Sequence, residues 1–265
     1  MNNSVQGPFA AVLTGVSHRY PAEPSNALEK VDLAIEANQS IVLIGRSGAG
    51  KSTLLSLLDG RLRGWSGAAV VLDHPMNSRH APSRSQRADV GFVFQEFALV
   101  ERASVRQNVL NGRLGRSDTL RTLIGKFSSD DYRIVESVME DTGIAPLADK
   151  PVSNLSGGQR QRVSIARCLA QEPRLILADE PISNLDPGAS ETILKLLNDS
   201  ARQREATLVF SSHQPQVAMT YADRVIVLDN GSIQFDGAPE DLSEQRLLKL
   251  YGTETSGDKR LRLVG

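Results

Sequence analysis

The sequence predicts an α/β fold in which a central sheet carries a phosphate-binding loop and an inserted helical segment. Residues 40–44 form a short apolar run, a glycine-rich stretch follows, and residues 53–58 have a helical pattern that ends at Gly60. Further short apolar runs indicate buried strands, whereas residues 96–155 contain no strand-like run. The runs lie at residues 90–94, 175–178, 207–210 and 225–228.

The N-terminal part predicts an antiparallel sheet. Residues 11–13 and the alternating residues 31–35 indicate two half-buried strands, joined by a proline-containing loop that carries Tyr20. Residues 69–72 indicate another strand, and the polar residues 76–89 are expected to be exposed.

The remaining segments predict helices and one hairpin. Helices are expected at residues 104–110 with Ser104 as N-cap, at 130–141 with Gly143 as its end, after Gly158 up to Pro173, and at 191–203. The Asn230-Gly231 pair predicts a tight turn between residues 225–228 and 232–235, because both residue types tolerate a positive φ.

Composition indicates a globular protein of ordinary type. The 265 residues are 40% hydrophobic and 23% charged, with a net charge of −1. This balance predicts no bulk attraction to nucleic acid or to anionic lipid. A single cysteine, Cys168, excludes a disulfide framework, and the first residues have no pattern of a signal peptide. No apolar run approaches the ~20 residues that cross a bilayer.

The glycine-rich stretch fits a phosphate-binding loop. A glycine, four free positions and Gly-Lys-Ser stand between a predicted strand and a helix. The glycines let backbone N–H groups point at an anion, and the helix N-terminus adds its dipole. Lys51 is expected on the outer phosphates and Ser52 on Mg²⁺. The predicted nucleotide contacts here are Gly45, Arg46, Ser47, Gly48, Ala49, Gly50, Lys51, Ser52 and Thr53.

Polar residues at the ends of three other predicted strands complete the expected site. Asp179 and Glu180 directly follow an apolar strand, where two adjacent carboxylates need a cationic partner. We expect Asp179 to bind Mg²⁺ and Glu180 to act as general base for water. His213 is expected to contact the terminal phosphate, and Gln95 to contact Mg²⁺ and the attacking water.

A second anion site is predicted where Ser156, Gly157, Gly158 and Gln159 open a helix. One nucleoside triphosphate needs only one phosphate loop. Two anion sites on one chain therefore favour a head-to-tail dimer, in which each copy completes the nucleotide site of the other.

Taken together, these motifs resemble the full motif set of an ABC-transporter ATPase subunit. They are Gly45 to Ser52, Gln95, Leu155 to Gln159, Leu175 to Glu180, Ser183 to Asp186 and His213. The resemblance covers about residues 10–240. It implies an ABC ATPase fold of the P-loop NTPase class, whose mixed sheet has a RecA-like parallel part, with an antiparallel β subdomain and an inserted α-helical subdomain.

The resemblance also implies ligands and a division of the chain. ATP and Mg²⁺ are expected, with Tyr20 stacked on adenine, Asp186 near the nucleotide, and Ser156, Gly157 and Gly158 on the nucleotide of the other subunit. The α/β core would comprise residues 10–95 and 160–240, the helical subdomain residues 96–159, and a C-terminal helix or tail residues 241–265.

The resemblance further implies the surroundings of the protein. It suggests a homodimer bound to transmembrane permease subunits at the cytoplasmic face of the inner membrane. A periplasmic substrate-binding protein would act indirectly, and no nucleic acid is expected as a partner.

A narrower resemblance points to the phosphonate-import subfamily, which serves phosphonates and reduced anions such as phosphite or hypophosphite. Residues 94–100, 104–115, 180–182 and 213–214 carry it, whereas Glu96 departs from the family's more frequent glutamine. An importer for another substrate, or an export or lipoprotein-release cassette, stays open. The short gap between the motifs disfavours DNA-repair and chromosome-organising ATPases, and the single phosphate loop disfavours translation-associated ones.

Three other features are expected to be structural. Cys168 and Trp65 are expected in the core. The charges of Lys259, Arg260 and Arg262 are expected on a solvated tail.

Overall fold

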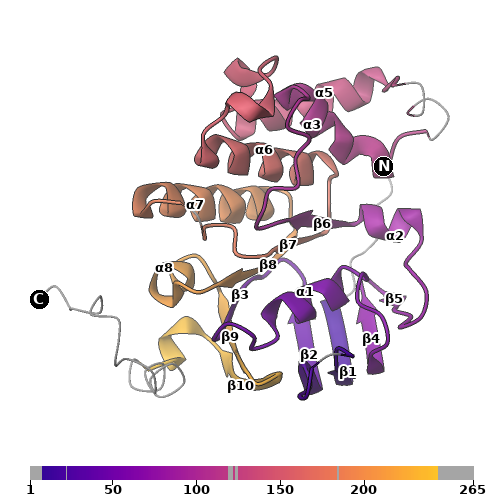
Figure 1. Ribbon diagram of the computed structural model, residues 1–265, viewed down its shortest axis with the longest axis vertical. Coiled ribbons are helices and arrows are strands. Elements are labelled where there is room, and N and C mark those ends of the chain that lie inside the picture. The colour runs from indigo at the N-terminus through magenta and orange to yellow at the C-terminus, as the bar shows by residue number, and fades with distance from the viewer. Residues whose placement is uncertain (1–7, 22, 119–121, 123–124, 184, 244–265) are drawn as a thin grey trace, which may run out of the picture.

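The computed structural model describes residues 8–21, 23–118, 122, 125–183 and 185–243, and it contains two sheets with helices around them (Figure 1). The six-stranded sheet has the order β10-β9-β3-β8-β7-β6, and only β10 runs antiparallel to its neighbour. Its strands are β3 (Ser40–Ile44), β6 (Val90–Val93), β7 (Leu175–Ala178), β8 (Thr207–Ser212), β9 (Arg224–Asp229) and β10 (Ser232–Gly237).

The four-stranded sheet is antiparallel and has the order β2-β1-β4-β5. Its strands are β1 (Phe9–His18), β2 (Leu28–Glu36), β4 (Ser66–Val71) and β5 (His74–Pro75). Helix α1 (Lys51–Leu58) packs into the hydrophobic core between the two sheets. The predicted antiparallel sheet and the predicted mixed sheet are both confirmed.

The other helices lie mainly on the far side of the six-stranded sheet, with α3, α5 and α6 grouped at the top of Figure 1. Only helices and turns, apart from one isolated bridge, occur in the described residues between β6 and β7. The α-helices are α2 (Arg84–Ala88), α3 (Val105–Leu110), α5 (Ser129–Asp141), α6 (Gly157–Ala170), α7 (Pro187–Gln203) and α8 (Pro215–Met219). The 3₁₀ helices are η1 (Asn111–Gly115), η2 (Ala145–Leu147), η3 (Val152–Asn154) and η4 (Pro239–Asp241).

Strands β3, β7, β8 and the middle of β9 are buried on both faces, which explains their apolar runs, whereas the edge strand β10 is mostly half-buried or exposed. Along β3, Val42 and Ile44 join the core on the side of α6 and α7, whereas Ile41 and Leu43 join the core around α1. Cys168 and Trp65 are buried as expected.

Side-chain caps fix the starts of the predicted helices. Ser104 accepts a hydrogen bond from the backbone N–H of Gln107 and begins α3. Ser128 and Ser156 each form a capping box, and Gly143 follows α5 with a φ of 69°. The turn at Asn230-Gly231 has φ values of 45° and 76°, as the hairpin prediction requires.

Two elements differ from the expectations. Residues 76–89 are not simply an exposed loop, because Ser83 forms a capping box that begins α2 and Ala88 is buried. Helix α7 begins four residues before Glu191, because Asp186 caps it and Pro187 occupies its first position.

None of the helices in the described residues is long and apolar enough to span a bilayer. The predicted solvated charges Lys259, Arg260 and Arg262, and also Asn184, lie outside the described residues.

Candidate functional site

The loop between β3 and α1 has glycines where a side chain would collide with neighbouring backbone. A Cβ atom on Gly45 would lie 2.3 Å from the carbonyl oxygen of Leu228, and one on Gly50 would lie 2.3 Å from that of Ala27. Gly50 also has a φ of 105° and caps α1 without any side-chain hydrogen bond. The N–H groups at the start of α1 are thus left for an anion.

Lys51 folds back into this loop. Its ammonium donates to the carbonyl oxygens of Gly45 at 2.7 Å and Arg46 at 3.1 Å, and the residue is only 6% exposed. Burial lowers the pKa of Lys51, while the nearby charges of Glu180 and Asp179 raise it. A desolvated cation therefore lies inside the loop, opposite two carboxylates.

Hydrogen bonds from serine hydroxyls connect Asp179, the first residue after β7, with the start of α1 and with β8. Ser52 Oγ donates to Asp179 Oδ1 at 3.1 Å, and Ser211 Oγ donates to the same oxygen at 2.7 Å. Ser211 Oγ also accepts from the backbone N–H of Glu180 at 2.8 Å. Ser211 is not among the predicted site residues, although its place near the end of β8, next to β7, is a signal for this contact.

Glu180 and His213 lie together, as their positions after neighbouring strands predict. His213 Nδ1 is 3.4 Å from Glu180 Oε2. Glu180 has a φ of +46°, a conformation that a residue with a side chain rarely adopts. Such backbone strain is typical of positions whose side-chain direction matters for function.

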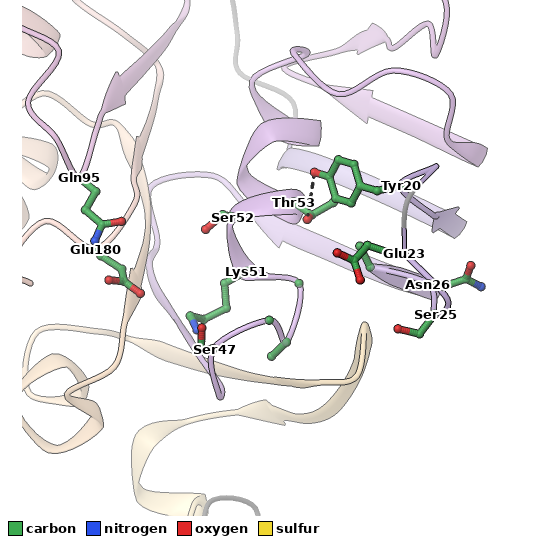
Figure 2. Close-up of a pocket in the computed structure, with 14 residues that line it drawn as sticks. Tyr20, Glu23, Ser25, Asn26, Ser47, Lys51, Ser52, Thr53, Gln95 and Glu180 are labelled. Atoms are coloured by element: carbon green, nitrogen blue, oxygen red, sulfur yellow. Dashed lines mark hydrogen bonds between the residues drawn. The ribbon is translucent and has the colours of Figure 1, made fainter.

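Lys51, Ser52 and Glu180 line a cavity of about 520 Å³, whereas Asp179, Ser211 and His213 do not line it themselves (Figure 2). Gln95 and Glu180 lie on one side of the loop and Tyr20 on the other. The Tyr20 hydroxyl is 3.3 Å from Thr53 Oγ1. The rings of His18 and Tyr20 meet edge to face, with their centroids 4.6 Å apart. The lining residues are Tyr20, Glu23, Ser25, Asn26, Ala27, Ser47, Gly48, Ala49, Gly50, Lys51, Ser52, Thr53, Gln95 and Glu180.

The cavity residues between β1 and β2 carry no pattern that marks them in the sequence. Glu23, Ser25, Asn26 and Ala27 come from a proline-containing loop with no periodic pattern. Only their position after Tyr20 could have indicated that they reach the same cavity.

Within one chain, the structure does not bring Ser156 to Gln159 or Asp186 to this cavity. Ser156 is exposed and caps α6, with its N–H donating to Gln159 Oε1 at 3.0 Å. Asp186 is exposed and caps α7, because its carboxylate accepts from the N–H of Ala189 at 3.0 Å. Gly157 and Gly158 occupy the first turn of α6.

Comparisons with known proteins agree with this geometry. The family model described as ABC transporter matches residues 28–183. The phosphonates import ATP-binding protein PhnC 1 of a Nostoc species is 41% identical over 230 residues, which are 86% of this chain and 87% of that protein.

Solved structures share the fold. CbiO1 from Clostridium perfringens, part of the ABC transporter complex CbiONQ, is 29% identical with a TM-score of 0.77 over 92% of this chain and 94% of that chain. The dimeric bacterial ABC transporter cassette MJ0796 is 28% identical with a TM-score of 0.76 over 86% of this chain and 98% of that chain. The loop, the carboxylates and these matches show that the chain belongs to the ABC transporter family, as an ATP-binding cassette that hydrolyses ATP.

Proposed function

We propose that this chain hydrolyses ATP to drive the import of a phosphonate, or of a reduced phosphorus anion such as phosphite or hypophosphite. The observation that carries the proposal is that Lys51, Ser52 and Glu180 line one cavity and that Asp179 accepts a hydrogen bond from Ser52. The similarity over most of the chain to a relative named as a phosphonates import ATP-binding protein supports the substrate class.

The donors around Ser52 fit Mg²⁺. The hydroxyl of Ser52 and the carboxylate of Asp179 are hard oxygen donors 3.1 Å apart, and the amide of Gln95 lines the same cavity. Among the described residues no group of three or more His, Cys, Asp and Glu side chains could hold a metal. Such a sparse set suits Mg²⁺, which takes few protein ligands beside phosphates and water. When bound, the ion neutralises charge on the β- and γ-phosphates.

Different residues of the chain bind the nucleotide and activate the attacking water. Lys51 and the N–H groups of the loop bind the phosphates, and Tyr20 offers its ring to adenine. Glu180 accepts the proton of the attacking water, and Gln95 orients this water without competing as a base. His213, held beside Glu180, donates a hydrogen bond toward the terminal phosphate.

In this proposal the exposed Ser156, Gly157 and Asp186 face the nucleotide of a second copy, together with the half-buried Gly158 and Gln159. Two observations support this arrangement: these residues do not line the cavity of their own chain, and the similar cassette MJ0796 is dimeric. Each nucleotide is then held between the loop of one copy and the α6 N-terminus of its partner.

The importer needs further subunits. We infer that two copies bind transmembrane permease subunits at the cytoplasmic face of the inner membrane, and that a periplasmic substrate-binding protein delivers the anion. The permease supplies the membrane anchor in this assembly.

A reconstituted complex tests the proposal. The full chain, with a candidate permease in proteoliposomes and a binding protein, is assayed for ATP hydrolysis with methylphosphonate, phosphite, hypophosphite or sulfate. Stimulation by one of the first three, absent with sulfate and with Lys51→Met, supports the proposal. ATP hydrolysis that none of these anions stimulates would contradict the substrate class while leaving the ATPase assignment intact.

A further inference from the structure

The segment after β6 turns sharply around Gln95. Phe97 and Ala98, two and three residues after Gln95, have φ values of 59° and 50°. These values lie in the left-handed region, which residues with side chains disfavour. The turn is closed by Phe97 N–H donating to Phe94 O at 3.1 Å and Ala98 N–H donating to Glu96 O at 2.6 Å. Two successive strained residues persist only where the surrounding structure holds them.

Arg167 of α6 holds both of these residues by their backbone. Its guanidinium donates through Nη2 to the carbonyl oxygen of Phe97 at 2.9 Å and through Nη1 to that of Ala98. Ser164, one turn earlier on α6, donates to the Phe97 carbonyl at 3.2 Å. The rigid fork of Arg suits two adjacent acceptors, and hydrogen bonds from a charged donor are stronger than neutral ones.

Helix α6 is itself fixed at the level of Arg167. A Cβ atom on Gly91 of β6 would lie 2.5 Å from Cys168 Sγ, and one on Gly112 of η1 would lie 2.1 Å from the carbonyl oxygen of Arg167. These close approaches show that α6 packs tightly against β6 and η1 at this level. Arg167 therefore links the segment around Gln95 to a closely packed part of the fold.

We propose that Arg167 is a positioning residue for ATP hydrolysis, which acts by fixing the Phe97–Ala98 turn and thereby the direction of Gln95. The inference rests on the proposed function, because Gln95 is there the group that orients the attacking water. Arg167 does not line the cavity, and its guanidinium is held by the carbonyl oxygens of Phe97 and Ala98.

A double-mutant cycle separates this role from a general structural one. ATP hydrolysis by the full-length chain is measured for wild type, Arg167→Met, Gln95→Ala and the double variant. The matched control is Arg162→Met, since Arg162 on the same helix also donates to a backbone carbonyl, that of Thr142 at 2.9 Å, away from Gln95.

We expect Arg167→Met to lower kcat by about 10- to 100-fold, the effect of a misplaced catalytic group, with little change in KM for ATP. In the Gln95→Ala background the same substitution should have almost no effect, because no side chain remains to be positioned. Arg167→Lys should retain part of the rate that Arg167→Met loses, since an ammonium can still donate to one of the two carbonyl oxygens. If Arg167→Met does not fold, Arg167→Lys replaces it in the double-mutant cycle.

Equal losses from Arg167→Met in both backgrounds, or equal losses from Arg162→Met, would overturn the positioning role. A wild-type rate for Gln95→Ala would instead show that the proposed role of Gln95 is wrong. The two failures are thus distinguishable in one data set.

Discussion

The hydroxyl of Ser52 lies 3.1 Å from Oδ1 of Asp179, although 127 positions separate the two residues in the chain. Ser52 is in the first turn of α1, just after β3, and Asp179 directly follows β7. Strand β8 lies between these two strands, and it supplies Ser211 as a second donor to the same oxygen. The parallel strand order therefore assembles the site, because the carboxyl ends of these strands meet at one edge.

Replacing Glu180 by Gln should stop hydrolysis while leaving ATP binding intact. The amide keeps the size of the side chain but cannot accept the proton of water, so kcat should fall by about 10²- to 10⁴-fold. Single-turnover hydrolysis and ATP binding by calorimetry measure the two effects. The exposed Glu191→Gln on α7 is the control, and a wild-type rate for Glu180→Gln would refute the assignment of the base.

Replacing Lys51 by Met should weaken ATP binding at least about ten-fold, because charge-assisted hydrogen bonds to phosphate are lost. Equilibrium binding of ATP measures the change. Lys195→Met, at an exposed position of α7, should bind ATP like wild type. Unchanged affinity of Lys51→Met would show that the ammonium stays on the loop carbonyls when ATP binds.

Replacing Ser211 by Ala should lower both stability and activity. The buried hydroxyl donates to Asp179 and accepts from the N–H of Glu180, so its loss should reduce the free energy of unfolding by about 1–3 kcal/mol. Asp179 also becomes less well oriented, so more Mg²⁺ should be needed for half-maximal hydrolysis.

Urea unfolding and Mg²⁺ titration of the ATPase rate measure the effects of Ser211→Ala. Ser212→Ala is the matched control, because Ser212 is equally buried on β8 but bonds to Gln214 instead. A Ser211→Ala protein with the Mg²⁺ dependence of wild type would argue against a role of this hydroxyl in the site.

Asp131 should make the stability depend on acidic pH. Burial raises the pKa of this carboxyl, but hydrogen bonds from Arg113 and Ser128 outweigh burial and hold the pKa at about 2. Since the pKa in the folded state lies below that in the unfolded state, the ionised group stabilises the fold above about pH 4, and this contribution is lost as the pH falls toward about 2. Asp131→Asn should therefore lower the free energy of unfolding by about 2 kcal/mol at neutral pH and by less in acid.

Urea unfolding across this pH range compares Asp131→Asn with wild type. Asp130→Asn is the control, because Asp130 is exposed and pairs with its neighbour on the helix surface, Arg133. A difference between Asp131→Asn and wild type that stays constant with pH would exclude the ionised carboxyl as its cause.

Much of the fold follows from local patterns in the sequence. The buried strands are short apolar runs, and the starts of α3 and α6 are marked by Ser104 and Ser156, whose side chains cap those helices. Helix α2 lacks an apolar periodicity and has only five residues, so its existence depends on the packing of Ala88 and on the cap at Ser83. Local patterns also place the start of α7 too late, because a proline in the first turn looks like a breaker without knowledge of the cap at Asp186.

The site could be predicted where its residues directly follow strands. Asp179 and Glu180 are the first two residues after β7, and His213 is the first after β8. Lys51 begins the helix that follows the loop after β3, and the sheet order brings these groups together. Ser211 and the residues between β1 and β2 could not be predicted, since their roles depend on which loops and hydroxyls face the cavity. The arrangement of Arg167 over Phe97 and Ala98 depends likewise on the packing of α6 against β6.

A structure of the ATP-bound Glu180→Gln protein tests most directly the claim that each copy holds only half of a working site. We predict a two-fold dimer in which Ser156 of one copy contacts the γ-phosphate that Lys51 of the other copy binds. A map in which Ser156 is remote from every γ-phosphate, in its own chain and in the neighbouring one, would contradict the account.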